Sequence, residues 1–374
     1  IKIQKLNDIE PEFFQGRTFG ESNEVVASVL EEVRTKGDAA LRIYGNKFDV
    51  AVPATFEVPQ EELKAAAEKL RIQKRDIYDA LVYSHDLALK FAKLQRNTFT
   101  DFEEEIESGI FAGQKTIPVE TAGCYVPAGR FPLVSTVIMT VTPAIAAGVK
   151  NVIMCTPPRV HPDDKIEAGK SGSGISGKAF VGGKPYADEG IMAAAYICGV
   201  NHLYAVGGSQ AIGAMAYGTA SIPKVDVIVG PGNKFVASAK RAVYGTVGID
   251  MVAGPTEVLI IADKTAKPEW LAADLLAQAE HDVVAQSVLV TDSMELANKV
   301  SDQIENQLET LTTKAIARQS IDTYGKIIVV EDLSQAVEIA NKKAPEHLEL
   351  AMEEGDLRNQ FQKALCNYGS LFIG

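Results

Sequence analysis

The stretch KVDVIVGPGNKFVASAKRAV, residues 224–243, joins a short apolar run to a glycine-rich turn and then to a helical pattern. The run has the length of a buried strand, and it ends at Gly230, Pro231 and Gly232. A helix is expected to begin at about Asn233, which is a favoured N-cap residue. Because a helix N-terminus also favours anions, the turn either approaches a ligand or is only a capped turn. The strand–turn–helix unit itself is typical of α/β proteins.

The same alternation recurs along the chain. Before this stretch, the apolar runs NVIMCT and HLYAV alternate with the helical segments EGIMAAAYICG and SQAIGAMAYG. After it, EVLIIAD, QSVLVTD and GKIIVVED alternate with further helical patterns, and YGSLFIG closes the sequence as a last strand. Strands that alternate with helices predict parallel sheets covered on both faces. We therefore expect an α/β protein with two such units.

The domain boundaries follow from where the pattern changes. Residues 1–18 have mixed polarity and no strong period, so they are predicted to form an N-terminal arm. We expect residues 19–123 and 257–374 to form one α/β domain and residues 124–256 a second one. Within the second, residues 159–185 are rich in Gly, Ser and Lys and are predicted to be a long inserted loop.

The bulk composition is that of a globular protein that binds neither nucleic acid nor membranes. Of its 374 residues, 46% are hydrophobic and 23% are charged, with a formal net charge of −12. No basic face is implied, and no apolar run reaches the roughly 18 residues of a membrane span. The N-terminus has no apolar segment of the signal-peptide type, so a cytoplasmic location is expected. The four cysteines lie among apolar or small residues without C-x-x-C spacing, which favours buried free thiols.

Two nucleotide-binding patterns can be set aside. Gly172, Gly177 and Lys178 match G-x-x-x-x-G-K, but Ala179 follows where a phosphate-binding loop needs Ser or Thr, and no apolar strand precedes it directly. No G-x-G-x-x-G follows a strand, so the usual dinucleotide fingerprint is missing. His161, in VHPDD, is predicted to be a solvated loop residue rather than a ligand.

The segment DLLAQAEHD, residues 274–282, places Gln278 and His281 three residues apart on a predicted helix. Residues at this spacing point the same way, and a carboxamide oxygen and an imidazole can share a divalent metal. Two ligands do not complete a site, so the pattern indicates only a possible metal-assisted centre.

Glu346 and His347 follow Pro345, which is expected to stop a helix. An adjacent carboxylate and imidazole can act as a general acid–base pair, but they can equally cap or form a local salt bridge. AGPTEVLIIAD similarly places Thr256 in what is either a turn or a ligand-binding segment ahead of a buried strand.

Six motifs together carry a family resemblance. YVPAGRFPLVSTVIM, GGSQAI, IPKVDVIVGPGN, AGPTEVLIIAD, DLLAQAEHD and APEHLEL occur in the order and spacing of the histidinol dehydrogenase family, and the resemblance runs from about residue 20 to the end. It implies two incomplete Rossmann-like domains, of which 124–256 resembles the NAD-binding one and the other carries the metal and catalytic residues. It also implies a zinc-dependent homodimer that oxidises L-histidinol to L-histidine through an aldehyde with two NAD.

The resemblance also assigns roles to particular residues. Gln278 and His281 match zinc ligands that hold the substrate, Glu346 matches the residue that activates water, and His347 matches the base that takes the alcohol proton and also contacts the substrate. Tyr125, Gln210 and Asn233 match positions that contact NAD. Thr256 matches a substrate-contacting position that is usually serine, and its methyl group narrows the pocket.

The family also has a later segment with an aspartate ligand and an arm with a histidine ligand used by the partner subunit. These two lie beyond Gly374, so we expect the printed sequence to be truncated. A same-fold dehydrogenase of another small polar alcohol, such as a sulfonated propanediol, is the alternative, with Arg130 as its candidate cationic anchor. A second alternative, from a different functional class, is a non-catalytic homologue that binds a ligand or partner.

Overall fold

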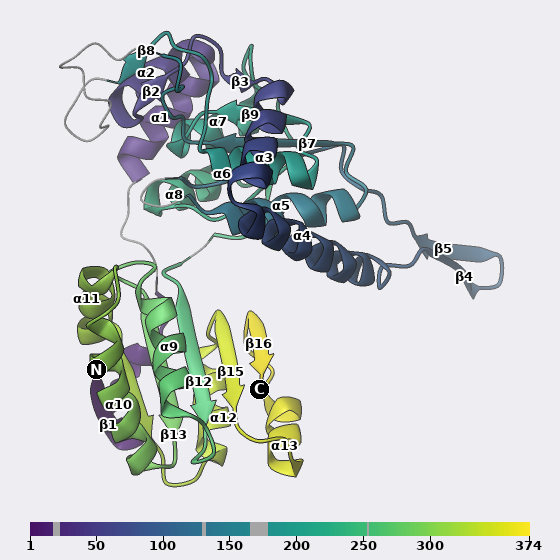
Figure 1. Cartoon of the computed structure of the whole chain (residues 1–374). Coiled ribbons are helices and arrows are strands. Elements are labelled where there is room, and N and C mark those ends of the chain that lie inside the picture. Colours follow the sequence, from purple (N-terminus) through teal and green to yellow (C-terminus); the bar gives the residue numbers. More distant parts are fainter. Residues whose placement is uncertain (18–22, 129–131, 165–178, 253) are drawn as a thin grey trace. The chain divides into compact units, whose positions relative to one another are not determined.

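The computed structural model of the protein contains two six-stranded sheets, each in its own α/β unit (Figure 1). The structure describes residues 1–17, 23–128, 132–164, 179–252 and 254–374. Unit 1 comprises Ile1–Phe19 and Gly254–Gly374, and unit 2 comprises Gly20–Ala253. The α/β fold class with parallel-sheet cores is therefore confirmed.

The sheet of unit 1 is entirely parallel. In spatial order its strands are β1 (Lys2–Lys5), β14 (Lys326–Val329), β13 (Gln286–Thr291), β12 (Glu257–Ala262), β15 (His347–Ala351) and β16 (Ser370–Ile373). Val258 on β12 lies beside Ser287 on β13 and His347 on β15. This register brings the amino-terminal ends of β12 and β15 together.

Helices cover both faces of that sheet. One face packs against α9 (Pro268–Ala279), α10 (Met294–Leu308) and α11 (Lys314–Tyr324), and the other against the short helix η2 (Pro11–Phe14), α12 (Ser334–Lys343) and α13 (Asp356–Ala364). Along β12, Val258 and Ile260 face the first layer, whereas Leu259 and Ile261 face the second. Successive side chains of β12 point to opposite faces of the sheet, and both faces are buried. This explains why the sequence of the strand is apolar throughout. The short helix η1 (Leu6–Asp8) connects β1 to η2.

The sheet of unit 2 has one antiparallel edge strand. In spatial order it contains β11 (Gly248–Ile249), β10 (Val227–Val229), β6 (Thr121–Tyr125), β7 (Asn151–Thr156), β9 (His202–Ala205) and β3 (Glu57–Val58). All neighbours are parallel except β3, which runs antiparallel to β9. A separate two-stranded ladder joins β2 (Ala51–Val52) to β8 (Phe180–Val181).

The helices of unit 2 form two layers around its sheet. One face packs against α1 (Asn23–Lys36), α2 (Asp38–Phe48), α7 (Gly208–Tyr217) and α8 (Lys234–Val243). The other packs against α3 (Gln60–Gln73), α5 (Val134–Ala146) and α6 (Glu189–Cys198), with α4 (Arg75–Arg96) outside α5. The hairpin β4 (Phe102–Glu107) and β5 (Ile110–Gln114) extends from this unit (Figure 1).

The predicted assignment of residues 19–123 to the same domain as 257–374 is wrong. These residues supply α1, α2 and α3, which pack on α7, α8 and α6 of unit 2, and β3, which extends its sheet. Amphipathic periodicity shows that a helix face is buried, but it does not show which sheet buries it. The predicted arm, residues 1–18, also differs from the structure, because Lys2–Lys5 pairs with β14 as an edge strand.

Several smaller predictions can be compared with the structure. His161 is buried, not solvated, and its ring lies edge-on to Tyr186 with centroids 4.9 Å apart. Cys124, Cys155 and Cys198 are buried free thiols as expected, whereas Cys366 is exposed. Arg130, the inserted-loop residues 165–178 and the phosphate-loop look-alike within them lie outside the described residues.

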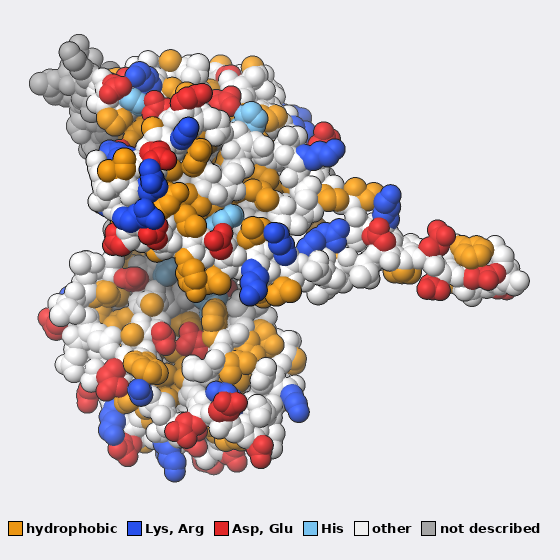
Figure 2. Space-filling view, turned by 45° about the vertical axis from the view of Figure 1, so that its right-hand side comes forward, with side chains coloured by type: hydrophobic (Ala, Val, Ile, Leu, Met, Phe, Trp, Pro, Cys, Tyr) orange, Lys and Arg blue, Asp and Glu red, His pale blue; other side chains and the backbone are white. Residues whose placement is uncertain are grey.

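An apolar stripe runs along the outer surface of α4 and continues onto the hairpin. Its members are the exposed side chains of Ile77, Tyr83, Leu87, Phe91, Leu94, Phe102, Ile106, Ile110 and Phe111. Hydrophobic and acidic side chains share the projecting hairpin (Figure 2). Exposed apolar patches of this kind mark interaction surfaces more often than lone apolar residues do. Among the helices that the structure describes, none is both long and apolar enough to cross a membrane.

Candidate active site

Two of the predicted cofactor-binding residues meet at the turn between β9 and α7. Tyr125, the last residue of β6, accepts a hydrogen bond on Oη from the backbone N–H of Gly208 at 3.0 Å. Gln210 lies in the first turn of α7 and is fully buried. Its Nε2 donates to Oδ2 of Asp49 at 3.2 Å. Burial raises the pKa of the Tyr125 phenol, so this side chain stays neutral at physiological pH.

Asp49 is a member of this cluster that sequence reasoning missed. It follows α2 directly and lies 161 residues from Gln210 in the chain. Burial raises the pKa of its carboxyl group to about 7, and the hydrogen bond from Gln210 acts in the opposite direction. The sequence offers no local signal for this role, because an aspartate after a helix is ordinary.

The third predicted cofactor residue, Asn233, caps α8. Its Oδ1 accepts from the backbone N–H groups of Phe235 and Val236 at 3.0 and 3.2 Å. The N-cap prediction is therefore confirmed, and the cap leaves the Nδ2 amide as the group that a ligand would meet. Gly230 ahead of it has φ +118°, and a Cβ there would lie 2.2 Å from the carbonyl oxygen of Tyr125. Only glycine fits this close approach.

A buried ion pair holds that turn in place. Lys240 on α8 is almost fully buried, and its Nζ donates to the carbonyl oxygen of Gly230 at 2.8 Å and to Asp250. Asp250 in turn accepts from the Gly230 N–H on Oδ2 at 2.8 Å. Sequence reasoning missed both charged residues. The turns after β9 and β10, together with Tyr125 at the end of β6, form a carboxyl-edge cluster, the position where parallel sheets usually bind ligands.

The remaining predicted site residues belong to unit 1 and lie at the opposite edge of their sheet. Thr256 immediately precedes β12, and its carbonyl oxygen accepts from the Gln286 N–H at 3.0 Å. His347 is the first residue of β15 and is half-buried. Nδ1 of His347 lies 3.1 Å from Oε1 of Gln278, which is buried near the end of α9. The structure thus brings Gln278 and His347 together at the amino edge of the strands.

His281 does not share the helix of Gln278 as predicted. α9 ends at Ala279, and His281 lies in the following turn, where it is exposed. Its Nδ1 is 2.8 Å from the carbonyl oxygen of Ala277. Because a carbonyl only accepts, this contact places the proton on Nδ1 and leaves the Nε2 lone pair outward. Imidazoles that bind metals commonly have this arrangement.

Gln278 also suits a metal ion. As oriented, its Nε2 is buried without a partner among the residues that the structure describes. Its Oε1 lies against Nδ1 of His347 and has a second lone pair, which is available to a cation. In the described parts of the chain, no three His, Cys, Asp or Glu side chains gather into a metal-binding group. The residues therefore fit part of a zinc site and would need further ligands.

Glu346 is exposed, and its backbone is held by hydrogen bonds from the segment that leads into β16. Its carbonyl oxygen accepts from the Ser370 N–H on β16 at 2.9 Å, and a Cβ at Gly369 would lie 2.6 Å from the same oxygen. Ala344, two residues earlier, has φ +51°, the only positive value for a non-glycine among the described residues. Strain of this kind is found where a neighbouring side chain must be aimed. The backbone of the Ala344–His347 segment, which carries Glu346 and His347, is thus restrained.

Lys343 and Glu257 form a buried ion pair beside the Ala344–His347 segment. Nζ of Lys343, at the end of α12, lies 2.8 Å from Oε1 of Glu257, and the two side chains are 2% and 13% exposed. Glu257 follows Thr256, and Lys343 precedes the Ala344–His347 segment. The pair therefore ties the two polypeptide segments that carry the predicted unit 1 residues. Sequence reasoning missed it.

Two carboxyl groups, those of Glu349 and Asp274, lie on the same strand and helix as His347 and Gln278. Glu349 shares the face of β15 with His347, and Asp274 lies one turn before Gln278 on α9. Burial, with the charge of Asp274 as a smaller cause, raises the pKa of Glu349 to about 7. Burial likewise raises the pKa of Asp274.

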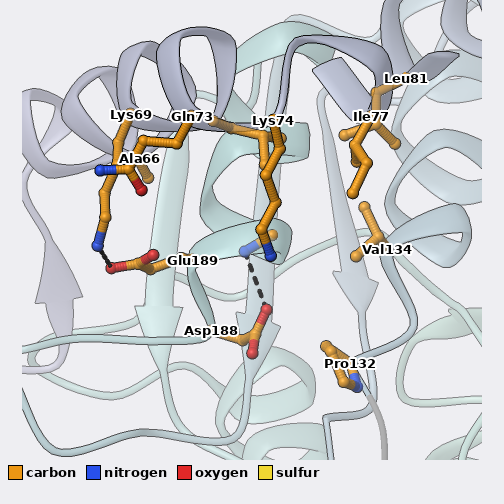
Figure 3. Close-up of a pocket in the computed structure, with 12 residues that line it drawn as sticks. Ala66, Lys69, Gln73, Lys74, Ile77, Leu81, Pro132, Val134, Asp188 and Glu189 are labelled. Carbon is orange, nitrogen blue, oxygen red and sulfur yellow. Dashed lines mark hydrogen bonds and ion pairs between the residues drawn. The ribbon is translucent and has the colours of Figure 1, made fainter. Parts of the chain in front are cut away.

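A cavity of about 460 Å³ lies elsewhere in unit 2 (Figure 3). Apolar side chains of α3 and α4 line it, together with Pro132 and Val134. Lys69 reaches across to Glu189 at 2.5 Å, and Asp188 caps α6 by accepting from the Gly190 N–H at 2.9 Å. None of the predicted site residues lines this cavity.

The architecture and the edge clusters define the chain as an α/β protein with ligand-binding features at strand ends. Comparison with known proteins sharpens this: the chain belongs to the histidinol dehydrogenase family, whose model matches residues 15–374. The histidinol dehydrogenase of Streptococcus mutans is 43% identical over 349 residues, covering 93% of this chain and 74% of that protein. The histidinol dehydrogenase of Aquifex aeolicus is 45% identical over 352 residues, with the same two coverages.

A solved structure agrees with the family assignment. The crystal structure of histidinol dehydrogenase from Elizabethkingia anophelis superposes with a TM-score of 0.84 at 33% identity. The match covers 100% of this chain and 79% of that one. The resemblance inferred from six short motifs is therefore confirmed at the level of the family and the fold.

Proposed function

We propose that this protein oxidises L-histidinol to L-histidine through the aldehyde, with two NAD as hydride acceptors, in the last step of histidine biosynthesis. The observation that carries the proposal is the family match over residues 15–374, within which the predicted residues occur as two edge clusters. The roles of individual residues below belong to this proposal.

His347 is the proposed base for the alcohol proton. With Nδ1–H donating to Oε1 of Gln278, Nε2 carries the lone pair that takes the proton as the first hydride leaves. In this orientation, Gln278 stabilises the tautomer of His347 that has its proton on Nδ1. The same histidine can release this proton to solvent before the second oxidation, because it is only half-buried.

Glu346 is the proposed base for water in the second oxidation. The water adds to the aldehyde carbon, its proton passes to the Glu346 carboxylate, and the hydrate loses a hydride to the second NAD. Exposure of Glu346 gives water access, and the hydrogen bond from the Ser370 N–H to its carbonyl oxygen restrains the backbone that carries the side chain. Thr256, half-buried ahead of β12, is the proposed hydroxyl contact to substrate.

Gln278 and His281 are the proposed protein ligands of zinc in this chain. When bound, zinc supplies a Lewis-acid anchor for the amine and imidazole of the substrate. The support comes from Oε1 of Gln278, which has a second lone pair besides the one that accepts from His347, and from the Nδ1 contact of His281, which leaves Nε2 for a ligand.

Tyr125, Gln210 and Asn233 are the proposed contacts to NAD. They gather at the carboxyl edge of the unit 2 sheet, next to the N-termini of α7 and α8. Helix N-termini stabilise anions, and the pyrophosphate of NAD is one. The cofactor itself supplies the hydride chemistry.

We also propose that two copies of the chain associate through the apolar stripe on α4 and the hairpin. From Tyr83 to Leu94 the stripe side chains recur every three to four residues along α4, as expected of a helix that packs on a partner. A cytoplasmic location stays a prediction.

The test of this function is NADH formation by the full-length, zinc-loaded protein, scored as NADH produced per alcohol consumed. Two NADH per L-histidinol, abolished by a chelator and restored by zinc, is the expected result. Turnover of a sulfonated propanediol but not of histidinol would replace the substrate and keep the chemistry. Absence of turnover with both, in a protein that unfolds cooperatively and binds zinc, would overturn the proposal.

A further inference from the structure

The buried polar cluster at the turn between β9 and α7 contains one residue to which no function has yet been given, Asp49. We infer that Asp49 is a positioning residue for NAD binding, which acts by holding the carboxamide of Gln210 in one orientation. The inference rests on the proposed function in one respect, namely that Gln210 contacts NAD.

Asp49 reaches Gln210 from a helix that packs against α7. α2 contacts α7, and the Asp49 N–H donates to the Gly45 carbonyl oxygen at 2.8 Å, which closes the last turn of α2. The other end of α2 is also fixed, because Asp38 accepts from the Ser221 hydroxyl at 2.6 Å. A carboxylate mounted on such a restrained helix has little freedom to leave its partner.

The turn has room for the Asp49 carboxylate only because its residues are glycines. A Cβ at Gly207 would lie 3.0 Å from Oδ1 of Asp49 and 3.0 Å from Cγ of Pro157. A Cβ at Gly208, whose φ is +65°, would lie 2.7 Å from Oε1 of Gln210. The paired glycines thus let the carboxylate and the carboxamide pack against the backbone of the turn.

The chemistry of the pair decides which way the amide points. When it is ionised, above its pKa of about 7, the Asp49 carboxylate only accepts hydrogen bonds, so Nε2 of Gln210 faces it. The Oε1 atom then faces away, and among the described residues nothing donates to it, although Gln210 is 0% exposed. A buried acceptor without a partner is unfavourable, and a ligand donor removes that cost on binding.

This orientation also specifies the ligand group. Oε1 accepts, so it meets a donor of NAD, which is a ribose hydroxyl or an amide N–H. Gly208 and Tyr125 complete the arrangement, because the Gly208 N–H is engaged by Tyr125 and is not available to compete for Oε1. Without Asp49, the carboxamide can turn over and present Nε2 to the same donor, which weakens NAD binding.

A double-mutant cycle tests the inference, with NAD binding measured directly by calorimetry and also as KM for NAD. The variants are Asp49→Ala, Gln210→Ala and the double variant, with Asp38→Asn as the matched control at the other end of α2. We expect Asp49→Ala to raise both Kd and KM for NAD about tenfold, with kcat and KM for histidinol within twofold. Asp49→Asn, which keeps an acceptor, should recover most of the affinity.

The decisive readout is the effect of Asp49→Ala in the Gln210→Ala background. A positioning role predicts no further loss there, because the side chain through which Asp49 acts is gone. Additive losses, or an unchanged Kd in Asp49→Ala while Gln210→Ala binds NAD weakly, would overturn the inference. An unchanged Kd in Gln210→Ala itself would instead show that the proposed NAD contact is wrong.

Discussion

Each edge cluster contains a buried glutamine among its predicted site residues, and these two amides differ in the kind of partner that holds them. Gln210 in unit 2 is held by the Asp49 carboxylate, whereas Gln278 in unit 1 faces the imidazole of His347. A carboxylate can only accept, but an imidazole can accept or donate according to its tautomer. Above the pKa of Asp49, the Gln210 amide is therefore fixed in one orientation, whereas the Gln278 amide can reverse together with His347.

This difference matches the ligands that the two clusters are proposed to bind. A fixed carboxamide suits a cofactor that must be held in the same way through two hydride transfers. A reversible one suits a site where a proton is taken up and released beside a cation. The clusters also lie at opposite edges of their sheets, carboxyl in unit 2 and amino in unit 1. The usual expectation that ligands bind at carboxyl ends holds for only one of them.

The largest effect is expected when the side chain that contacts Gln278 is removed. We expect His347→Asn to lower kcat for histidinol about 10³-fold, because a positioned base contributes about 10²- to 10⁴-fold. Steady-state kinetics at saturating NAD measure this. Tyr125→Phe in unit 2 is the matched change, and it should alter mainly KM for NAD. A kcat for His347→Asn within tenfold of the parent would assign the base to another residue.

The next largest effect concerns the buried lysines of the two units. Lys343→Met leaves Glu257 buried and unpaired, which should lower the free energy of unfolding by about 3 kcal/mol. Lys240→Met should cost less, about 1–2 kcal/mol, because the Asp250 side chain is 33% exposed and can be solvated.

Urea unfolding separates the two lysine variants. The single tryptophan, Trp270, lies on α9, so its fluorescence follows unit 1, whereas circular dichroism follows both units. Lys343→Met should shift the fluorescence transition, and Lys240→Met should shift mainly the dichroism. Equal losses in the two variants would show that exposure of the partner carboxylate does not decide the cost.

Replacing each of the two glutamines by glutamate should have different effects in the two clusters. Gln210→Glu places a second carboxylate against Asp49, so we expect KM for NAD to rise about tenfold, equivalent to about 1.4 kcal/mol. Gln278→Glu instead adds an anionic oxygen beside His347 and should retain zinc at the level of the parent protein after dialysis. Metal analysis and NAD titration measure the two outcomes. Loss of zinc in Gln278→Glu would argue against an oxygen ligand at this position.

Local patterns predicted the fold class and the Asn233 cap because both depend on neighbouring residues. They did not predict Asp49 or the Lys343–Glu257 pair, because each contact joins residues that are 161 or 86 positions apart. The assignment of α1 to α3 to the wrong unit has the same origin. A helix face that needs burial can pack on either sheet, and only the tertiary structure selects one.

The placement of His281 on the helix of Gln278 was wrong for a more local reason. The apolar period runs through Ala279, and Glu280 then turns the chain, so the predicted spacing of three crosses the helix end. Helix ends are less well specified by periodicity than helix interiors. The proposed ligand pair therefore has a helical member and a turn member.

The smallest expected effect is on stability, and it follows from the pKa of Asp49. Folding raises this pKa to about 7, so the folded state binds more protons than the unfolded one above the ordinary carboxyl range. The contribution of Asp49 to stability is thus complete in acid, declines as the pH rises toward 7 and is flat above it. Asp49→Asn lacks this slope, so its stability relative to the parent should increase by about 1 kcal/mol between pH 6 and 7.

Urea midpoints of both proteins at pH 5, 6, 7 and 8 measure this difference, since all other titrating groups are shared. Asp38→Asn is the control, and its difference from the parent should not follow the same curve. A difference for Asp49→Asn that does not change with pH would mean that Asp49 is ionised throughout. The Gln210 amide would then be held by a carboxylate over the whole range, and the contrast with Gln278 would be sharper still.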